Sequence, residues 1–259
     1  MNDGKAAMAS ASQSTLLATA LLLAAVSSAG AESYRTHYGA SLFGLPVGRA
    51  TFESRFEGNG FAIAGRFASA GIARLFERTD GTVAVNGVFA GGASHPARYE
   101  LEYTEGKERQ KTVIRFARGA VAETKNEPPL KKRGDDWVPL GREHLSGAAD
   151  PISALLLPVS SSEEVCSRTI RVYDGEIRAD IVLQPATERE SFRGAAITCR
   201  ARFVPVSGYR RNHSSITYLR DRARMFVGFE PVGGRDLYSP VEATIATKIG
   251  TVHIRARTM

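Results

Sequence analysis

The chain has 259 residues, of which 34 are Lys or Arg and 27 are Asp or Glu, so its formal net charge is +7. This length is enough for one large β-domain or two small ones. After residue 31 no stretch approaches the roughly 20 apolar residues that a membrane-spanning helix requires, so we expect no transmembrane segment there.

The first 31 residues have the layout of a secretory signal peptide. Lys5 lies in a short polar start, an apolar run extends from Leu16 to Val26, and Ala29-Gly30-Ala31 forms an A-x-A cleavage site. An uncleaved membrane anchor is the alternative, but the apolar run is shorter than a span usually needs. We expect cleavage after Ala31, a periplasmic location and a mature chain of residues 32–259 that forms a single antiparallel β domain.

The positive charge remains in the mature chain because Asp3 and Lys5 cancel within the discarded segment. In a cytosolic protein this charge would favour nucleic-acid binding, but an exported chain meets anionic lipids and envelope polymers instead. A solubilising charge excess spread over the surface is the alternative. The partner that we expect is therefore an anionic lipid or envelope polymer, and no nucleic acid.

Short segments in which apolar and polar residues alternate, bounded by turn-forming residues, predict strands and hairpins in the first half of the mature chain. Gly58-Asn59-Gly60 and Glu105-Gly106-Lys107 predict hairpin turns. The predicted strands are residues 52–56, 61–67, 82–86, 99–103 and 112–117.

Residues 125–137 differ in composition from the segments around them. They carry paired prolines and the basic triplet Lys131-Lys132-Arg133, with little that could pack. We expect a polar excursion from the sheet, whose triplet either touches an anionic partner or is an ordinary solvated surface.

The next segment predicts a helix. Asp150 at the N-cap and Pro151 at the first helical position are a typical helix start, and Pro158 ends the helix after Ile152–Leu157. Its apolar side chains are expected to plug one side of the sheet.

The last hundred residues again predict strands, with Asp174-Gly175 as a candidate type I′ turn. The predicted strands are residues 169–173, 178–183, 197–204, 215–219, 225–229, 241–249 and 251–255. Many short strands with one short helix favour an all-β, mainly antiparallel fold, either a strongly curved sheet or a partly open barrel. A two-sheet sandwich is the alternative, but glycines interrupt several strands, which favours curvature.

Cys166 and Cys199 are the two cysteines of the chain. Two thiols that enter an oxidising compartment usually pair, so we predict a disulfide between them. There is no C-x-x-C motif, and no His lies near them in sequence, so we expect no redox or metal role.

The sequence contains none of the G-x-S-x-G, S-x-x-K and H-E-x-x-H signatures and no phosphate-binding glycine loop. Ser153 near Asp150, and His213 beside Ser214, are not interpreted as parts of a hydrolase, because Ser153 is typical of a helix cap and a strand is predicted after His213. We expect no catalytic residue, no cofactor, no metal and no enzymatic activity. The histidines are scattered, at His37, His95, His144, His213 and His253.

The densest positive feature is Tyr209–His213, with further arginines up to residue 224. Arginine offers a planar fork of donors that suits phosphate and carboxylate groups. Arg210, Arg211 and Arg224 are therefore candidate ligand-binding residues, although Asp221 lies within the run and partly neutralises it. An ordinary charged surface is the alternative.

Three stretches together resemble the DUF3108 family of bacterial exported proteins without an established function. They are YGASLFGLPVGRA at Tyr38–Ala50, DPISAL at Asp150–Leu155, and VYDG at Val172–Gly175 followed by CRARFVPVSGY at Cys199–Tyr209. The resemblance covers most of the mature chain, and its motifs are turns, a capped helix and a cysteine. It implies a periplasmic location and a disulfide, and it implies no reaction.

These features predict a periplasmic β-protein that supports the cell envelope by holding a lipid or another amphipathic or anionic molecule within a curved sheet. The alternative is a structural or protein-interaction module with a filled interior, and a hydrolase ranks third. In the module with a filled interior, the side chains that fill it are Phe52, Phe56, Ile63, Phe67, Leu101 and Tyr103.

Overall fold

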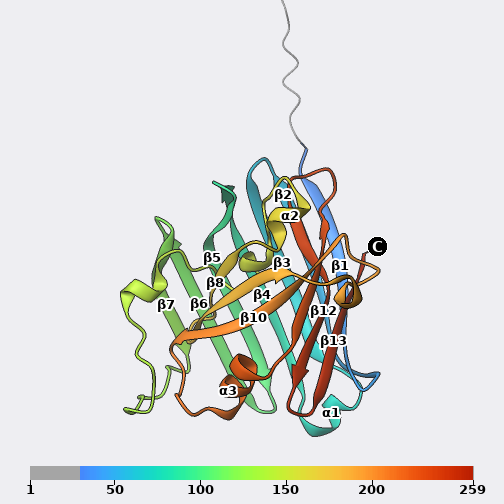
Figure 1. Cartoon of the computed structure of the whole chain (residues 1–259). Helices are drawn as coiled ribbons and strands as arrows, with labels where there is room; N and C mark the ends of the chain where they lie inside the picture. The colour runs from blue at the N-terminus through green and yellow to red at the C-terminus, as the bar shows by residue number, and fades with distance from the viewer. Residues whose placement is uncertain (1–29, 259) are drawn as a thin grey trace, which may run out of the picture.

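A computed structural model describes residues 30–258, and Figure 1 shows their path as one strongly curved sheet. Nearly all of the predicted signal peptide lies outside the described residues. No helix among the described residues is long and apolar enough to cross a membrane.

Thirteen strands form one antiparallel sheet, so the predicted all-β fold is confirmed. The strands are β1 (Glu32–Leu42), β2 (Leu45–Glu57), β3 (Gly60–Ser69), β4 (Thr79–Ala90), β5 (Ala93–Glu105), β6 (Glu108–Ala117), β7 (Ala120–Glu127), β8 (Thr169–Tyr173), β9 (Arg178–Pro185), β10 (Ile197–Ser207), β11 (Met225–Pro231), β12 (Tyr238–Thr247) and β13 (Gly250–Thr258). The helical segments are α1 (Ala73–Phe76), α2 (Ser162–Val165), α3 (Ser214–Asp221) and the 3-10 turns η1 (Arg142–Leu145), η2 (Ser153–Leu155) and η3 (Glu188–Glu190).

The sheet consists of two meanders joined at its middle. Its strand order is β7-β6-β5-β4-β3-β2-β1-β13-β12-β11-β10-β9-β8, so the first and last strands of the chain pair with each other. In this pairing Tyr38 lies opposite Ala256. The two sheet edges, β7 and β8, therefore come from the middle of the chain.

The connection between β7 and β8 bridges these two edges. The backbone N–H of Gly147 donates to the carbonyl of Gly119 at 2.8 Å, beside the start of β7. Two residues later, the Ala149 N–H donates to Arg171 at 2.9 Å, and the Ala149 carbonyl accepts from Tyr173 at 2.8 Å. The sheet is not closed strand to strand, and this segment occupies part of the gap, so the structure is a partly open barrel.

The predicted helix over Ile152–Leu157 is wrong. Only the 3-10 turn η2 forms, because Leu156 has extended backbone angles and Leu157 exchanges two hydrogen bonds of 2.9 Å with Tyr238. Asp150 nevertheless caps this turn, since its Oδ1 accepts from the N–H groups of Ile152 and Ser153 at 2.9 Å each.

The predicted strand at 215–219 is also wrong, because these residues belong to α3, the longest helix among the described residues. Ile216 is buried and Leu219 packs against the core. Their spacing of three residues places both on one helical face, which outweighs the strand preference of the β-branched residues in this segment.

Two loops differ from their predictions. β7 extends to Glu127, which pairs with Lys111, so the polar excursion begins later than residue 125. Asp174-Gly175 does not form a type I′ turn, because Tyr173 pairs with Arg178 and the loop comprises residues 174–177. The Asp174 carboxylate holds this loop by accepting from the N–H groups of Glu176 and Ile177 at 2.8 and 2.7 Å.

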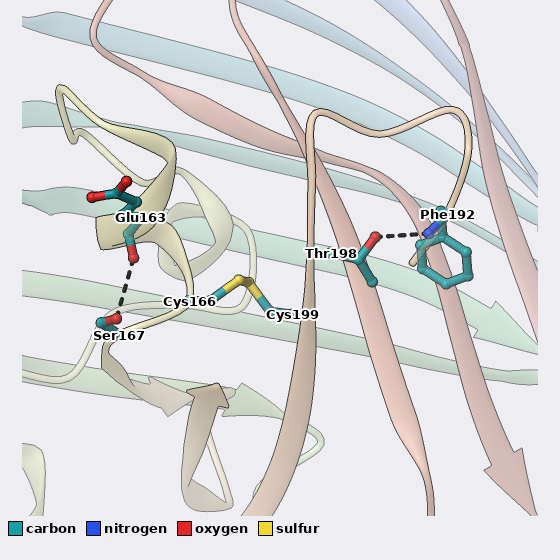
Figure 2. Close-up of a disulfide and its surroundings, with 6 residues drawn as sticks. All are labelled: Glu163, Cys166, Ser167, Phe192, Thr198 and Cys199. Atoms are coloured by element: carbon teal, nitrogen blue, oxygen red, sulfur yellow. Dashed lines mark hydrogen bonds between the residues drawn. A yellow bond between two sulfur atoms is a disulfide. The ribbon is translucent and has the colours of Figure 1, made fainter. Parts of the chain in front are cut away.

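The predicted disulfide is confirmed. Cys166 follows α2 and Cys199 lies in β10, and their sulfurs are bonded within the buried core (Figure 2). In the chain-entropy model a loop of this length contributes about 3.7 kcal/mol to stability. The disulfide therefore fixes part of the β7–β8 connection to the sheet.

We predict that Asp150→Ala lowers the free energy of unfolding by about 3 kcal/mol, because it leaves two backbone N–H groups and the Ser153 hydroxyl without a partner in a fully buried site. Asp150→Asn keeps an acceptor for the N–H groups and should cost less. Urea unfolding followed by circular dichroism measures both. Equal stability of the alanine variant and the wild type would contradict the role of this cap.

Candidate functional site

The concave face of the central strands carries mostly apolar or small side chains. On β1, Tyr34, Thr36, Tyr38 and Ala40 alternate toward the interior, whereas the residues between them belong to the outer face. This alternation is visible in the sequence, but the strand predictions missed β1. They also missed β7.

Side chains fill one part of the interior. A buried cluster over β2 to β6 includes Phe56, Ile63 and Tyr99, and a second cluster over β8 to β11 includes both cysteines and Phe229. Residues 148–159 of the β7–β8 connection contribute to both clusters. The segment thus acts as a plug that the two halves of the sheet share.

The plug does not fill the space in front of β1, β2, β12 and β13. A cavity of about 910 Å³ remains there, with Ile152, Leu155 and Leu156 as the wall contributed by the plug. Ala50 and Ala243 on the sheet leave much of this space open because their side chains are small. Other lining residues are Ala40, Val47, Phe52, Phe67, Val227, Val241, Ile245 and Ile254.

Tyr38 forms part of the cavity wall. Its ring meets Phe52 edge to face at 5.7 Å between centroids, and its hydroxyl donates to the carbonyl of Pro240 at 2.6 Å. Burial raises the pKa of Tyr38 to about 12. The phenol is therefore neutral at physiological pH, and its hydrogen is already bonded to the backbone.

Arg235 makes several contacts at the end of the cavity that Tyr34 and Gly233 line. The Arg235 Nε donates to Glu32 at 2.9 Å, its Nη1 donates to the Gly58 carbonyl at 3.0 Å, and its guanidinium lies over the Phe56 ring at 5.4 Å. The hydrogen bond from Arg235 lowers the pKa of Glu32. These contacts join the β11–β12 loop to the start of β1.

Apolar side chains make up most of the wall of this cavity. Its polar lining consists mainly of hydroxyl groups. Three charged side chains also border it, Arg49, Glu230 and Glu242, and Glu242 is paired with Arg255 at 2.8 Å. Among the described residues, no group of three or more His, Cys, Asp and Glu side chains is arranged to hold a metal ion. The arrangement provides mainly apolar contact area, with hydroxyl and charged groups among its lining.

The candidate arginines occupy two places beside α3. Arg210 and Arg211 lie in the loop before it, where Arg210 pairs with Asp136 at 2.7 Å and the Arg211 N–H donates to the Asp136 carbonyl at 2.8 Å. Arg224 lies after the helix, directly before β11. The loop of residues 128–138 thus packs beside residues 208–211, so the two basic features of the sequence are neighbours in the fold.

Apart from Tyr103, the side chains that a filled interior would require lie in the buried cluster, along the cavity, or in both. Phe56 and Ile63 are buried in the filled part, with Leu101 packed against them. Phe56 and Ile63 also border the cavity, as do Phe52 and Phe67. Phe52 packs against the filled part as well, and Tyr103 belongs neither to this cluster nor to the cavity lining. The sequence suggested a ligand within the curved sheet but did not locate the cavity. Alternation identifies the inward-facing residues, but it does not show how far the plug extends between the strands.

Comparisons with known proteins identify a family. The family model DUF3108, described as a protein of unknown function, matches residues 33–256. No curated protein matches the chain. A solved structure described as a beta-barrel-like protein of domain of unknown function DUF1849 from Brucella abortus is 11% identical, with 88% of this chain and 98% of that chain covered and a TM-score of 0.49.

We predict a loss of stability at alkaline pH that depends on Tyr38. The folded-state pKa of Tyr38 lies above the ordinary value of 10. The contribution of Tyr38 to the free energy of unfolding is therefore complete below pH 10 and is lost as the pH rises through about 12. The loss amounts to about 3 kcal/mol. Tyr38→Phe should lose correspondingly less stability over this range in urea unfolding. An equal alkaline loss in both proteins would contradict the assignment.

Proposed function

The chain belongs to the DUF3108 family, and we propose that it is an exported binding protein that holds a lipid or another amphipathic molecule inside its curved sheet. The observation that carries this proposal is the cavity of about 910 Å³ between the central strands and the plug. Its size falls within the range of roughly 300–1,000 Å³ that is common for ligand sites.

The composition of the cavity wall supports an acyl or similarly elongated apolar group as the bound part. The lining extends along the length of β1 from Tyr34 to Ala40, past the aromatic pair of Tyr38 and Phe52. Removing apolar ligand surface from water contributes roughly 25 cal/mol per Å². The hydroxyl groups of the lining can satisfy a few polar atoms without requiring a charge on the ligand.

Export is supported by two observations. The Cys166–Cys199 disulfide is fully buried, and disulfides persist mainly in oxidising compartments such as the periplasm. The strand β1 begins at Glu32, directly after the predicted cleavage site, so removal of the signal peptide would leave the sheet complete. We place the protein in the periplasm, where it would serve the cell envelope as a carrier or store of its ligand.

We predict that two enlarged side chains displace the ligand. Ala50→Leu with Ala243→Leu adds volume inside the cavity, and the matched control, Ala62→Leu with Ala64→Leu, adds it on the exposed outer face of β3. Native mass spectrometry of protein purified from periplasm should show bound lipid for the wild type and the control and a bare chain for the cavity variant. Affinity for the fluorophore N-phenyl-1-naphthylamine should fall by about tenfold in the cavity variant.

Two outcomes would overturn the binding proposal. One is a wild type that carries no ligand and does not bind the fluorophore, which would favour a structural or interaction module. The other is equal binding by the cavity variant and the wild type, provided that circular dichroism shows both to be folded.

Export has its own test. Intact mass measurement of the protein from a periplasmic extract should give a chain that begins at Glu32, because the A-x-A site ends at Ala31. A full-length chain recovered from the cytoplasm would contradict export and leave the cavity proposal unaffected.

A further inference from the structure

A group of exposed apolar side chains lies at one end of the sheet. Phe43 and Leu45 belong to the β1–β2 hairpin, Ile72 and Phe76 to the β3–β4 connection, and Ile249 to the β12–β13 turn. Phe76 is 89% exposed, Phe43 74% and Ile249 71%. We call these five residues the apolar tip. Exposed apolar residues that gather in one place usually mark an interaction surface.

The three connections are neighbours in space. The strands β13, β1, β2 and β3 are consecutive in the sheet, and Figure 1 shows α1 at the same end as the β12–β13 turn. A Cβ atom at Gly250 would lie 2.6 Å from the Phe43 ring, so Phe43 touches the start of β13. On the other side, the Ala70 N–H donates to the Val47 carbonyl at 3.0 Å, which holds the β3–β4 connection against β2.

Basic residues border the apolar tip on its β12 side. Lys248 precedes Ile249 in the turn, and the Arg224 carbonyl accepts from the Ala246 N–H at 2.9 Å, which places Arg224 beside the same turn. Both side chains are exposed. Within the part of the chain that the structure describes, neither forms an ion pair, so both are available to an anionic partner.

The nearby carboxylates are occupied or directed elsewhere. Asp221 pairs with Arg220 at 2.7 Å, and Asp80 pairs with Arg78 at 2.9 Å. Glu77 points toward Gly106 of the β5–β6 turn, on the side of the tip away from Lys248. The side of the tip toward β12 and α3 is therefore net positive.

We infer that this end of the protein docks on an anionic lipid bilayer. Apolar side chains that project from turns enter the interface between head groups and acyl chains, and adjacent Lys and Arg side chains are attracted to anionic lipids. A soluble anionic polymer would use the cations but leave Phe43, Phe76 and Ile249 in water. A bilayer matches both the apolar and the basic part of the surface.

The docked orientation would bring the cavity to the membrane. Ala40, Val47, Ser69 and Ile245 line the cavity and lie near the same strand ends as the apolar tip. Docking itself does not depend on an occupied cavity, so it can be tested separately from ligand binding.

The test is co-sedimentation with vesicles. Vesicles of phosphatidylcholine with about one third phosphatidylglycerol should bind the wild-type protein at low salt, and raised salt should weaken binding because exposed charges are screened. The variant Phe43→Asn/Phe76→Ser/Ile249→Ser should lose about tenfold or more of its binding. Asn is chosen at residue 43 because that residue has a positive φ of 52°. The control Val88→Ser/Leu130→Ser removes exposed apolar residues outside the tip and should bind normally.

A second pair of variants tests the charges. Lys248→Glu/Arg224→Glu should abolish the preference for phosphatidylglycerol, whereas the control Arg189→Glu/Arg193→Glu makes the same charge change near the β9–β10 connection and should retain it. In a Phe76→Trp variant, tryptophan emission should shift to the blue when these vesicles are added.

Three results would overturn the inference. They are a wild type that ignores the anionic vesicles at low salt, a tip variant that binds as well as the wild type, and a dimer in sedimentation velocity that the tip substitutions dissociate. The last result would assign the tip to contact between two copies of the chain. Each of these outcomes can occur with the cavity filled or empty, so none bears on the proposed function.

Discussion

A curved sheet that does not close has two edges with unpaired backbone groups, and one connecting segment reaches both edges of this sheet. Gly147 bonds beside β7 and Ala149 bonds to β8, so residues 147–149 bridge the gap. Exposed strand edges promote association with other chains, and covering them with a segment of the same chain is a common solution. This bridge constrains the path of the chain after Ala149, so that the following residues enter the interior of the sheet.

The interior that results is filled unevenly. Asp150, which is fully buried, turns the chain inward, and the residues after it pack against both halves of the sheet. The disulfide and the hydrogen bonds between Leu157 and Tyr238 then hold the segment on the β8 to β12 side. The space in front of β1 and β2 is beyond its reach, so the cavity follows from where the plug is attached.

The sequence predicted the fold through signals that are local. Hairpins such as β2–β3 are identified by alternation around a glycine turn, and the disulfide was predicted from two cysteines in a chain expected to be exported. The predicted helix failed because a distant partner decides the local structure. Residues 152–157 have a helix start, but Leu157 pairs with Tyr238 more than 80 residues away. Likewise the cavity depends on the plug, and the apolar tip on three turns that only the strand order brings together.

The pairing of β1 with β13 has a consequence for how the protein folds. Hairpins within each meander can form as soon as both of their strands are present, since their contacts are close in sequence. The pairing of β1 with β13 is different, because its contacts join residues far apart in the sequence, such as Tyr38 and Ala256. Until β13 is available, β1 is an unpaired edge, and the strands β1 and β12 on the two sides of the cavity are not joined. Assembly of the cavity is therefore a late event of folding, and a chain truncated before β13 would lack both the β1–β13 pairing and the complete cavity.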